Sequence, residues 1–369
     1  MKKNEFKYPY NNPQIRKERI GLITFHWAIN YGAILQAFSL QQFLLNHGYY
    51  SEIINYVPKK ILLKDRISRI RRFSISETIK EFRFIQFRNS YLKITKTRYK
   101  TNRQLKNKCQ NFSHYICGSD QIWNEWFIYN SENKPNLTYY LDFVKEDVYR
   151  ISYAASFGTS SLSNRTKSII QSELEKFSMI SVRENSGKKI IDGLNLESEV
   201  VVDPTLLIDK SVYDNMISDL KDKETFDIFL FTLHGEDKKG AYVCREISRD
   251  LFRDTAKIYK RKSDSIKRWI YSIKNSKIVI TNSFHCLMFA LIYHKPFIVL
   301  PVEGNEINDR ISTVLKIINQ TERCLLANMD NKIALLIQEK IDWNFVDSQI
   351  SIQRQKSIDL LLQSLENTR

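Results

Sequence analysis

Residues 278–300 constrain the fold of this chain more than any other stretch of the sequence. They contain a short apolar strand, a polar turn from Thr281 to Ser283, an apolar helix that carries His285, and a second apolar strand after a Lys-Pro pair. Apolar runs of this kind are typical of a parallel sheet that helices cover on both faces. At the strand-to-helix junction, polar side chains would lie beside helix amides that favour an anion. Alternatively, Ser283 only caps the helix and His285 is an ordinary first-turn residue.

Strands and helices alternate through the rest of the chain. Residues 20–25, 33–45 and 51–56 read as strand, helix and strand, a βαβ unit that should be right-handed and parallel. Further strands are expected at 112–117, 150–155, 180–183, 226–233 (ending at His234-Gly235) and 256–259, and further helices at 162–177, 238–253, 265–274 and 350–365. This order predicts an α/β protein of two doubly wound, Rossmann-like domains that face each other across a cleft.

The alternation restarts near Leu206, and we place the domain boundary there. An N-terminal Rossmann-like domain is predicted over residues 1–205 and a C-terminal one over 206–347, followed by an amphipathic C-terminal helix over 348–369. The chain has 369 residues, of which 43% are hydrophobic, so both domains can form ordinary cores.

Cysteine usage and hydropathy indicate the compartment. The five cysteines are scattered and contain no C-x-x-C pair, which favours reduced thiols over disulfides or a zinc site. The N-terminus lacks the apolar core of a secretory signal, and no apolar run reaches the roughly 20 residues that span a bilayer. We therefore expect a cytoplasmic protein.

Nearly all of the excess positive charge lies in one segment. The chain carries a formal net charge of +16, and residues 59–108 alone hold 17 Lys or Arg against three acidic residues, a net of +14. Apolar residues recur among these charges at roughly helical spacing. Such a basic amphipathic segment suits an anionic membrane surface, a pyrophosphate-bearing substrate or nucleic acid, or it is a solvated helical face.

Several common active-site motifs are absent from the sequence. It contains no G-x-G-x-x-G, no P-loop, no H-E-x-x-H and no G-x-S-x-G. These absences argue against a dinucleotide site, a zinc protease and a serine hydrolase, and we expect neither a metal nor a redox cofactor.

Polar clusters instead occupy the expected strand ends. There are seven: Asn30-Tyr31-Gly32, Ser119-Asp120-Gln121, Ser156-Phe157-Gly158, Arg183-Glu184, Asp203, His285 and Asn308-Asp309-Arg310. Each alone could be a turn, a cap or an exposed ion pair of little energy. Together they predict one shared site.

The order of these segments resembles the polysaccharide pyruvyl transferase family. The matching segments run from residue 20 to residue 310: Thr24-Phe-His-Trp-Ala-Ile-Asn-Tyr-Gly-Ala-Ile-Leu-Gln36, Gly118-Ser-Asp-Gln-Ile-Trp-Asn124, Ser152-Tyr-Ala-Ala-Ser-Phe-Gly158, Ser181-Val-Arg-Glu184, Val202-Asp-Pro-Thr205 and Thr281-Asn-Ser-Phe-His285. The resemblance implies a fold like that of GT-B glycosyltransferases. It also implies that phosphoenolpyruvate binds between the domains and that its pyruvyl group is transferred to a sugar of a surface polysaccharide, usually as a cyclic ketal.

The resemblance assigns the donor to the C-terminal domain. His285 would be the general acid or a phosphate-binding group, and Arg183, Glu184, Ser283 and Arg310 would bind the donor. One departure concerns the segment that reads Arg-Leu-His in related enzymes, because the arginine is replaced here by Ser283. Lys267 and Arg268 are further candidates for the missing positive charge.

The acceptor is assigned to the N-terminal domain. Asp120, or less favourably Glu184, would be the base that activates a sugar hydroxyl, and Asn30, Gln121 and Trp123 would offer hydrogen bonds and a stacking face. An acceptor linked to a polyprenyl pyrophosphate would give the basic segment a purpose at the inner face of the cell membrane. Two alternatives remain: a nucleotide-sugar-dependent GT-B glycosyltransferase and, ranked lower, a nucleic-acid-binding protein; with the transferase reading, no nucleic acid partner is expected.

Overall fold

The structure is a computed structural model that describes residues 18–61, 74–132, 135–221, 223–233, 237–260, 263–302, 308–325 and 333–366. The predicted turn at His234-Gly235 and residues 62–73 of the basic segment lie outside the described residues. The chain divides into two compact units, one of residues 1–208 with 354–369 and the other of residues 209–353.

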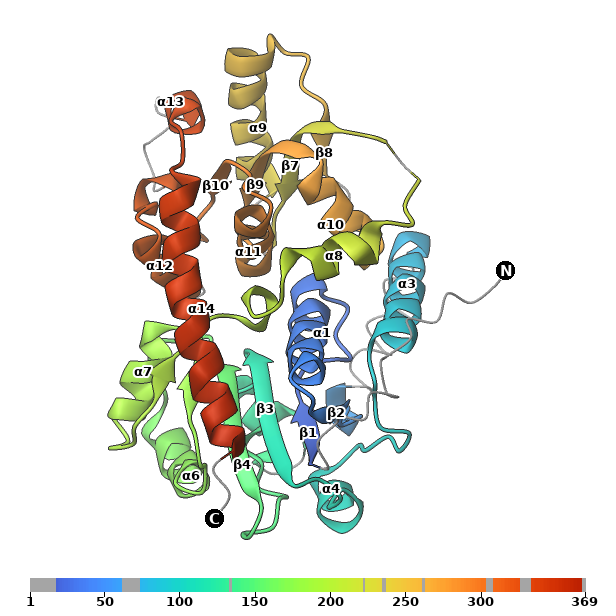
Figure 1. Ribbon diagram of the computed structural model, residues 1–369, viewed down its shortest axis with the longest axis vertical. Coiled ribbons are helices and arrows are strands. Elements are labelled where there is room, and N and C mark those ends of the chain that lie inside the picture. The colour runs from blue at the N-terminus through green and yellow to red at the C-terminus, as the bar shows by residue number, and fades with distance from the viewer. Residues whose placement is uncertain are drawn as a thin grey trace. The chain divides into compact units, whose positions relative to one another are not determined.

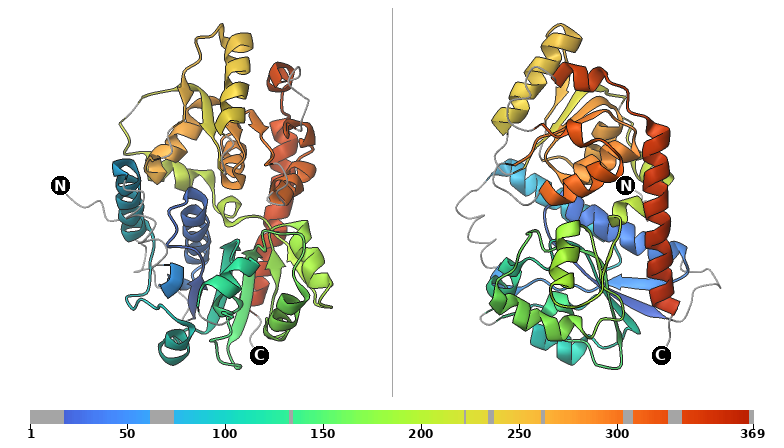
Figure 2. Two further views of the ribbon diagram at one scale, coloured as in Figure 1. Left: turned by 180° about the vertical axis from the view of Figure 1, so that it is seen from behind. Right: turned by 90° about the vertical axis from the view of Figure 1, so that its left-hand side faces the viewer.

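The first unit is built on a six-stranded sheet (Figure 1). Its order is β2-β1-β3-β4-β5-β6, and all the pairings between these strands are parallel. The strands are β1 (Arg19–Ile23), β2 (Tyr50–Ile53), β3 (His114–Asp120), β4 (Tyr149–Ala155), β5 (Ser181–Val182) and β6 (Glu199–Val200). Almost every residue of β3 and β4 is buried, because helices lie on both sides of the sheet (Figure 2).

Helices connect these strands. They are α1 (Tyr31–Asn46), α3 (Ile75–Tyr91), α4 (Asn102–Lys108), α5 (Glu125–Asn130), α6 (Asn164–Leu174) and α7 (Asn185–Asp192), with short 3₁₀ turns η1 (Thr138–Tyr140) and η2 (Pro204–Leu206). α1 is buried from Tyr31 to Leu44, which explains its mostly apolar sequence. It begins two residues earlier than predicted because the Asn30 side chain caps it, accepting a hydrogen bond from the Ala33 N–H.

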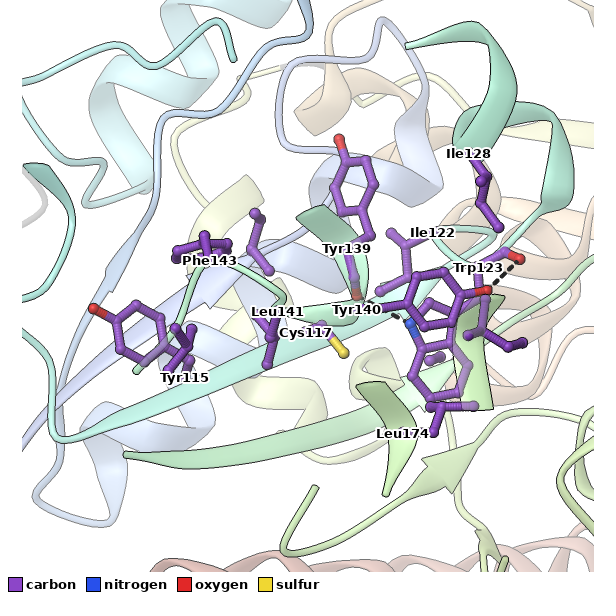
Figure 3. Close-up of a cluster of buried hydrophobic side chains, with 14 of the residues drawn as sticks. Tyr115, Cys117, Ile122, Trp123, Ile128, Tyr139, Tyr140, Leu141, Phe143 and Leu174 are labelled. Atoms are coloured by element: carbon purple, nitrogen blue, oxygen red, sulfur yellow. Dashed lines mark hydrogen bonds between the residues drawn. The ribbon is translucent and has the colours of Figure 1, made fainter. Parts of the chain in front are cut away.

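A large aromatic cluster fills the core of the first unit (Figure 3). The Trp123 ring stacks on the Tyr140 ring, with centroids 5.3 Å apart and planes 7° from parallel. The Trp123 indole N–H donates to the Tyr139 carbonyl at 3.0 Å, and the Tyr140 hydroxyl donates to the Trp123 carbonyl at 3.1 Å. Both polar groups are therefore satisfied inside the core.

The second unit contains a four-stranded parallel sheet of order β10-β9-β7-β8. Its strands are β7 (Phe226–Phe231), β8 (Ile258–Tyr259), β9 (Ser276–Thr281) and β10 (Phe297–Val299). Its helices are α8 (Lys210–Ile217), α9 (Asp237–Phe252), α10 (Ile266–Lys274), α11 (Phe284–Ile292), α12 (Asn308–Ile317) and α13 (Ile333–Gln338), with the 3₁₀ turn η3 (Thr321–Arg323).

The last helix, α14 (Trp343–Glu366), begins in the second unit and from Arg354 onward belongs to the first. There the Ser357 hydroxyl accepts from the Val202 N–H at 3.0 Å, and the Arg354 Nε donates to the Leu207 carbonyl at 3.1 Å. The end of the chain therefore completes the first unit, where the sequence suggested a separate C-terminal helix after residue 347.

Candidate functional site

Each sheet has a point where its strand order reverses. In the first unit β1 lies between β2 and β3, so the chain leaves β1 toward one side and returns on the other. In the second unit β7 lies in the same way between β8 and β9. Open α/β sheets bind ligands outside the carboxyl ends of the strands at such a switch point.

Polar side chains close the first switch point. The Thr24 hydroxyl, just after β1, donates to the Ser119 carbonyl in β3 at 2.9 Å. The Gln36 side-chain amide of α1 donates to the same Thr24 hydroxyl at 2.9 Å. These buried bonds fix the ends of β1 and β3 relative to each other and to α1.

His26, in the same segment, is a buried histidine with a structural role. One ring nitrogen lies 3.2 Å from the Thr24 carbonyl and the other 3.4 Å from the Asn55 side-chain oxygen. Burial lowers the pKa of His26 to about 4, so the imidazole is neutral near pH 7. A neutral buried ring that already contacts two oxygens is a poor general acid.

Asp120 ends β3 at this switch point with an unusual backbone. Its φ is +81°, a region that costs a residue with a side chain of order 1–3 kcal/mol. The Ser156 N–H, after β4, donates to the Asp120 carbonyl at 3.1 Å, and the Gln121 N–H donates to its Oδ1 at 2.9 Å. The carboxylate is thereby aimed at the carboxyl edge of the sheet while remaining partly exposed.

The Arg183 guanidinium is buried among carboxylates. Its Nη1 donates to Asp203 Oδ2 at 2.9 Å and to the Ser119 hydroxyl at 3.2 Å. Its Nη2 lies 3.9 Å from Asp120 Oδ1, and its Nε lies 3.9 Å from Glu184 Oε2. Burial disfavours the charged form, but the three carboxylates together outweigh it, so the pKa of Arg183 is raised. This cation is already compensated inside the first unit.

The expected acceptor residues occupy different environments. Asn30 is exposed at the start of α1, and Gln121 is half-buried next to Asp120. Gly158 lies against Gln121: its φ is +67°, and a Cβ there would come within 2.3 Å of the Gln121 Nε2. Trp123 contradicts its predicted role, because its ring is fully buried in the core and offers no face to a sugar.

Two other tryptophans were missed by the sequence analysis. Trp126, at the start of α5, is 45% exposed, and Trp27, after β1, is half-buried. Phe25 and Phe127 lie between them, with ring centroids 5.7 Å apart for Phe25 and Trp27, 4.4 Å for Phe25 and Phe127, and 5.0 Å for Trp126 and Phe127. The available signal was Asn124, a typical N-cap residue, which caps α5 by accepting from the Trp126 N–H.

The second switch point is fixed by the Thr281-Asn282 pair. The Thr281 hydroxyl donates to the Phe231 carbonyl of β7 at 2.6 Å and accepts from the Ser283 N–H at 2.9 Å. The Asn282 side chain accepts from the Leu233 N–H at 2.7 Å and donates to the Leu233 carbonyl at 2.8 Å. Together they hold the end of β9 against the end of β7.

α11 starts directly after this pair. Ser283 occupies the N-cap position, but within the described chain its side chain makes no capping hydrogen bond. His285 follows in the first turn and is buried. The first turn of a helix leaves backbone N–H groups without an intrahelical acceptor, and such groups favour an anion.

Arg310 is the cation that accompanies this helix start. It lies on α12, is buried, and its guanidinium carbon is 5.8 Å from the centre of the Phe284 ring. The alternatives Lys267 and Arg268 form ion pairs elsewhere, with Asp219 at 2.6 Å and with Glu224 at 2.5 Å. Arg310 is thus better placed than either to supply charge near His285.

Among the described residues, no three His, Cys, Asp or Glu side chains gather as metal ligands would. In the same part of the chain, no helix has the length and hydropathy that crossing a membrane requires.

The two parallel sheets define a GT-B-like α/β protein, as predicted. The putative UDP-N-acetylglucosamine 2-epimerase of Listeria monocytogenes has a similar structure, with a TM-score of 0.55 and 10% identity over 96% of this chain and 98% of that chain. The UDP-GlcNAc 2-epimerase of Methanocaldococcus jannaschii, solved with UDP-GlcNAc and UDP, has a TM-score of 0.49 and 14% identity over 92% and 99%. Spinosyn forosaminyltransferase SpnP has a TM-score of 0.45 and 8% identity over 95% of this chain and 99% of that chain. At 10% identity, the likeness to the Listeria monocytogenes protein shows the fold alone.

The sequence identifies the family. The model of the polysaccharide pyruvyl transferases matches residues 30–304, and the chain belongs to this family. This confirms the resemblance drawn from the six sequence segments. No curated protein sequence matches the chain significantly.

Proposed function

We propose that this chain transfers the pyruvyl group of phosphoenolpyruvate to a sugar of a surface polysaccharide or of its lipid-linked precursor. The product would be a cyclic pyruvate ketal and inorganic phosphate. One observation supports this most: the family segments around Asp120 and His285 form the switch points of the two sheets.

The donor would bind at the start of α11. Phosphoenolpyruvate carries close to three negative charges, so its site needs cations and backbone donors. The first-turn amides of α11, the Ser283 hydroxyl and the Arg310 guanidinium can supply them. On this proposal Arg310 compensates for the arginine that Ser283 replaces in this chain.

The reaction gives one proton to carbon and removes one from each of two sugar hydroxyls. Protonation of the methylene carbon makes the neighbouring carbon electrophilic, and a sugar hydroxyl adds to it and loses its proton. The carbon–oxygen bond to phosphate then breaks, and a second hydroxyl closes the ketal as its proton passes to the departing phosphate. A histidine suits the acid because its pKa lies near neutrality. His285 would give the proton or bind the phosphate.

Asp120 would be the base that accepts the hydroxyl proton. Its carboxylate is partly exposed at the first switch point, while its backbone is held by Ser156 and Gln121. The geometry of Arg183 favours a positioning role over the donor-binding role expected from the sequence, because the guanidinium is buried and compensated by Asp203. Glu184, also buried next to it, would share that role.

The acceptor would lie beside Asp120. Gln121 and Asn30 would contribute hydrogen bonds, and the exposed Trp126 ring would take the stacking role that the buried Trp123 cannot have. We propose an acceptor carried on a polyprenyl pyrophosphate, which would place the reaction at the inner face of the cell membrane.

Calorimetric titration with phosphoenolpyruvate, UDP and GDP tests the donor. We expect saturable binding of phosphoenolpyruvate alone, weakened by His285→Ala and unchanged by His294→Asn, a matched change at the other end of α11. Binding of a nucleotide without phosphoenolpyruvate would instead support a nucleotide-sugar-dependent glycosyltransferase. No binding of phosphoenolpyruvate, even with acceptor present, would overturn the proposal.

Steady-state kinetics separates the two roles of His285. If it transfers a proton, His285→Ala should lower kcat by about 10²–10⁴-fold. If it binds phosphate, KM for phosphoenolpyruvate should rise while kcat changes little. Wild-type kcat and KM in the variant would exclude both roles.

A further inference from the structure

Helix α3 packs on the first unit through one aromatic face. Phe84, Phe87 and Tyr91 project from it toward α1. The ring centroids of Tyr31 and Phe84 are 5.1 Å apart, and Phe38 lies 6.3 Å from Phe87 and 6.1 Å from Tyr91. These contacts fix which face of α3 points away from the unit.

Four large apolar residues are exposed on that outward face. Ile75 is 69% exposed, Ile79 43%, Phe82 67% and Ile85 38%. Their spacing of four, three and three residues places them on one side of the helix. A surface helix normally carries polar residues there, and a contiguous exposed apolar patch usually marks a binding surface. We call these four residues the α3 stripe.

A strongly basic stretch follows α3 directly. Residues 92–108 contain seven Lys or Arg and no acidic residue. Part of this stretch runs parallel to β2 at the sheet edge, with Ile94 opposite Ile53 and Tyr99 opposite Tyr56. The chain bends at Lys96 and Thr97 between these two pairings, and Lys96, Arg98 and Lys100 are exposed at and after the bend.

Five of these seven cations are exposed and form no ion pair with the described part of the chain: Lys96, Arg98, Lys100, Arg103 and Lys108. Lys106 lies 3.8 Å from Asp142. Lys96 and Lys108 also line a polar pocket of about 220 Å³. We call the five unpaired residues the basic strip.

Protection of a sheet edge explains part of this pattern. Lysines on an edge strand discourage pairing with another chain. That role does not require an apolar helix face next to the charges, nor cations beyond the edge strand such as Arg103 and Lys108.

We propose that the α3 stripe and the basic strip together dock the protein on an anionic lipid bilayer. In Figures 1 and 2, α3, the segment after it and α4 follow one another along the same side of the first unit. The apolar residues enter the boundary between headgroups and acyl chains, and the cations meet the lipid phosphates. Nucleic acid would use the same cations but would leave the three isoleucines of the stripe without a partner. The inference goes beyond the transfer reaction and does not depend on it.

Flotation of the full-length protein with vesicles tests this surface. We expect recovery with vesicles that contain phosphatidylglycerol and little recovery with phosphatidylcholine alone. Raising the salt concentration from about 0.1 M to about 1 M should reduce binding, because the Debye length falls from about 10 Å to about 3 Å.

Two variants separate the contributions of the stripe and the strip. Lys96→Gln/Arg98→Gln/Lys100→Gln should lower the partition coefficient about 100-fold, since each charge contributes a factor of about five. Ile79→Ser/Phe82→Ser should abolish the binding that remains at high salt. Matched controls at exposed sites of the same chemistry, Lys316→Gln/Lys340→Gln/Lys356→Gln and Leu335→Ser/Phe345→Ser, should leave binding unchanged.

Equal recovery of the wild type with both vesicle types would overturn the proposal. It would also be overturned if the two variants bound vesicles as strongly as the wild type does. A fluorescently labelled RNA is titrated in parallel. RNA binding that the charge variant loses, without vesicle binding by the wild type, would reassign the strip to nucleic acid. Phosphoenolpyruvate binding should be the same in all variants, so failure here is distinct from failure of the proposed reaction.

Discussion

Arg183 joins the ends of several strands through one guanidinium. It follows β5, contacts Ser119 in β3 and Asp203 after β6, and lies 3.9 Å from Asp120 at the end of β3. Asp203 in turn accepts from the N–H and the hydroxyl of Thr205. A buried charge is tolerated only when it is paired and hydrogen-bonded. The network therefore ties the position of Asp120 to the integrity of the sheet edge.

Replacing Arg183 tests this dependence. Arg183→Met should lower the free energy of unfolding by about 3–5 kcal/mol, because Asp203 remains buried without its cation. Arg183→Met/Asp203→Leu should recover part of the loss, since an apolar pair of similar volume can replace a buried ion pair. Urea denaturation measures both, with exposed Arg103→Met as the control, expected within about 0.5 kcal/mol of wild type. If Arg183→Met were as stable as this control, Arg183 would not stabilise the fold.

For single residues, the sequence predicted which side chains lie at strand ends better than it predicted what surrounds them. It placed Asp120 and His285 at strand ends, because apolar runs stop there. It could not distinguish Trp123 from Trp126, since both lie in the same short segment and only packing decides that one ring is buried against Tyr140. Nor could it show that Arg183 is compensated, because its partner Asp203 is twenty residues away in sequence.

Asn282 fixes the geometry of the junction between β9 and α11. Both polar ends of this side chain bond to Leu233, which fixes where α11 begins relative to β7. The position of His285 depends on that start.

Asn282→Leu should therefore act on both stability and donor binding. It leaves the N–H and carbonyl of Leu233 without their partner, at a cost of about 1–3 kcal/mol, and lets the first turn of α11 shift. We expect weaker phosphoenolpyruvate binding by calorimetry and a lower urea midpoint. The control is Asn215→Leu on the exposed surface of α8, expected to match wild type. Donor binding equal to that of the wild type would show that the start of α11 does not form the donor site.

Several long elements were predicted well from the sequence and short ones only approximately, although α14 begins seven residues before the helix expected at 350–365. The helix expected at 33–45 is α1 over Tyr31–Asn46, because apolar periodicity and the Asn30 cap agree. In place of the strand expected at 180–183 the structure has the shorter β5, Ser181–Val182. In place of the strand expected at 256–259 it has the shorter β8, Ile258–Tyr259. Two-residue strands are defined by the neighbours they pair with, which local sequence does not contain.

In the molecule as a whole, the end of α14 is part of the first unit's core. Leu361 and Leu365 are buried there, while Ile352, earlier on the same helix, is 47% exposed. The amphipathic pattern of the tail predicted a helix that needs a partner, but it could not indicate which domain the helix would join.

Leu361→Ala should lower the free energy of unfolding by about 2–5 kcal/mol, as a fully buried leucine does when truncated to alanine. Ile352→Ala is the control on the same helix and should cost less than about 0.5 kcal/mol. Deletion of residues 354–369 should be more severe than Leu361→Ala. The urea unfolding transition of each variant checks this, and a deletion variant with wild-type stability would contradict it.

The path of α14 also sets the order in which the protein can mature during synthesis. The first unit begins at the N-terminus, yet all of residues 209–353 must be translated before its last helix is made. At a ribosomal rate of about 5–20 residues per second, this interval lasts roughly seven to thirty seconds. During it, the nascent first unit lacks Leu361 and Leu365 and leaves that part of its core open to solvent and to chaperones. The first unit, whose synthesis starts before that of the second, is thus completed after it.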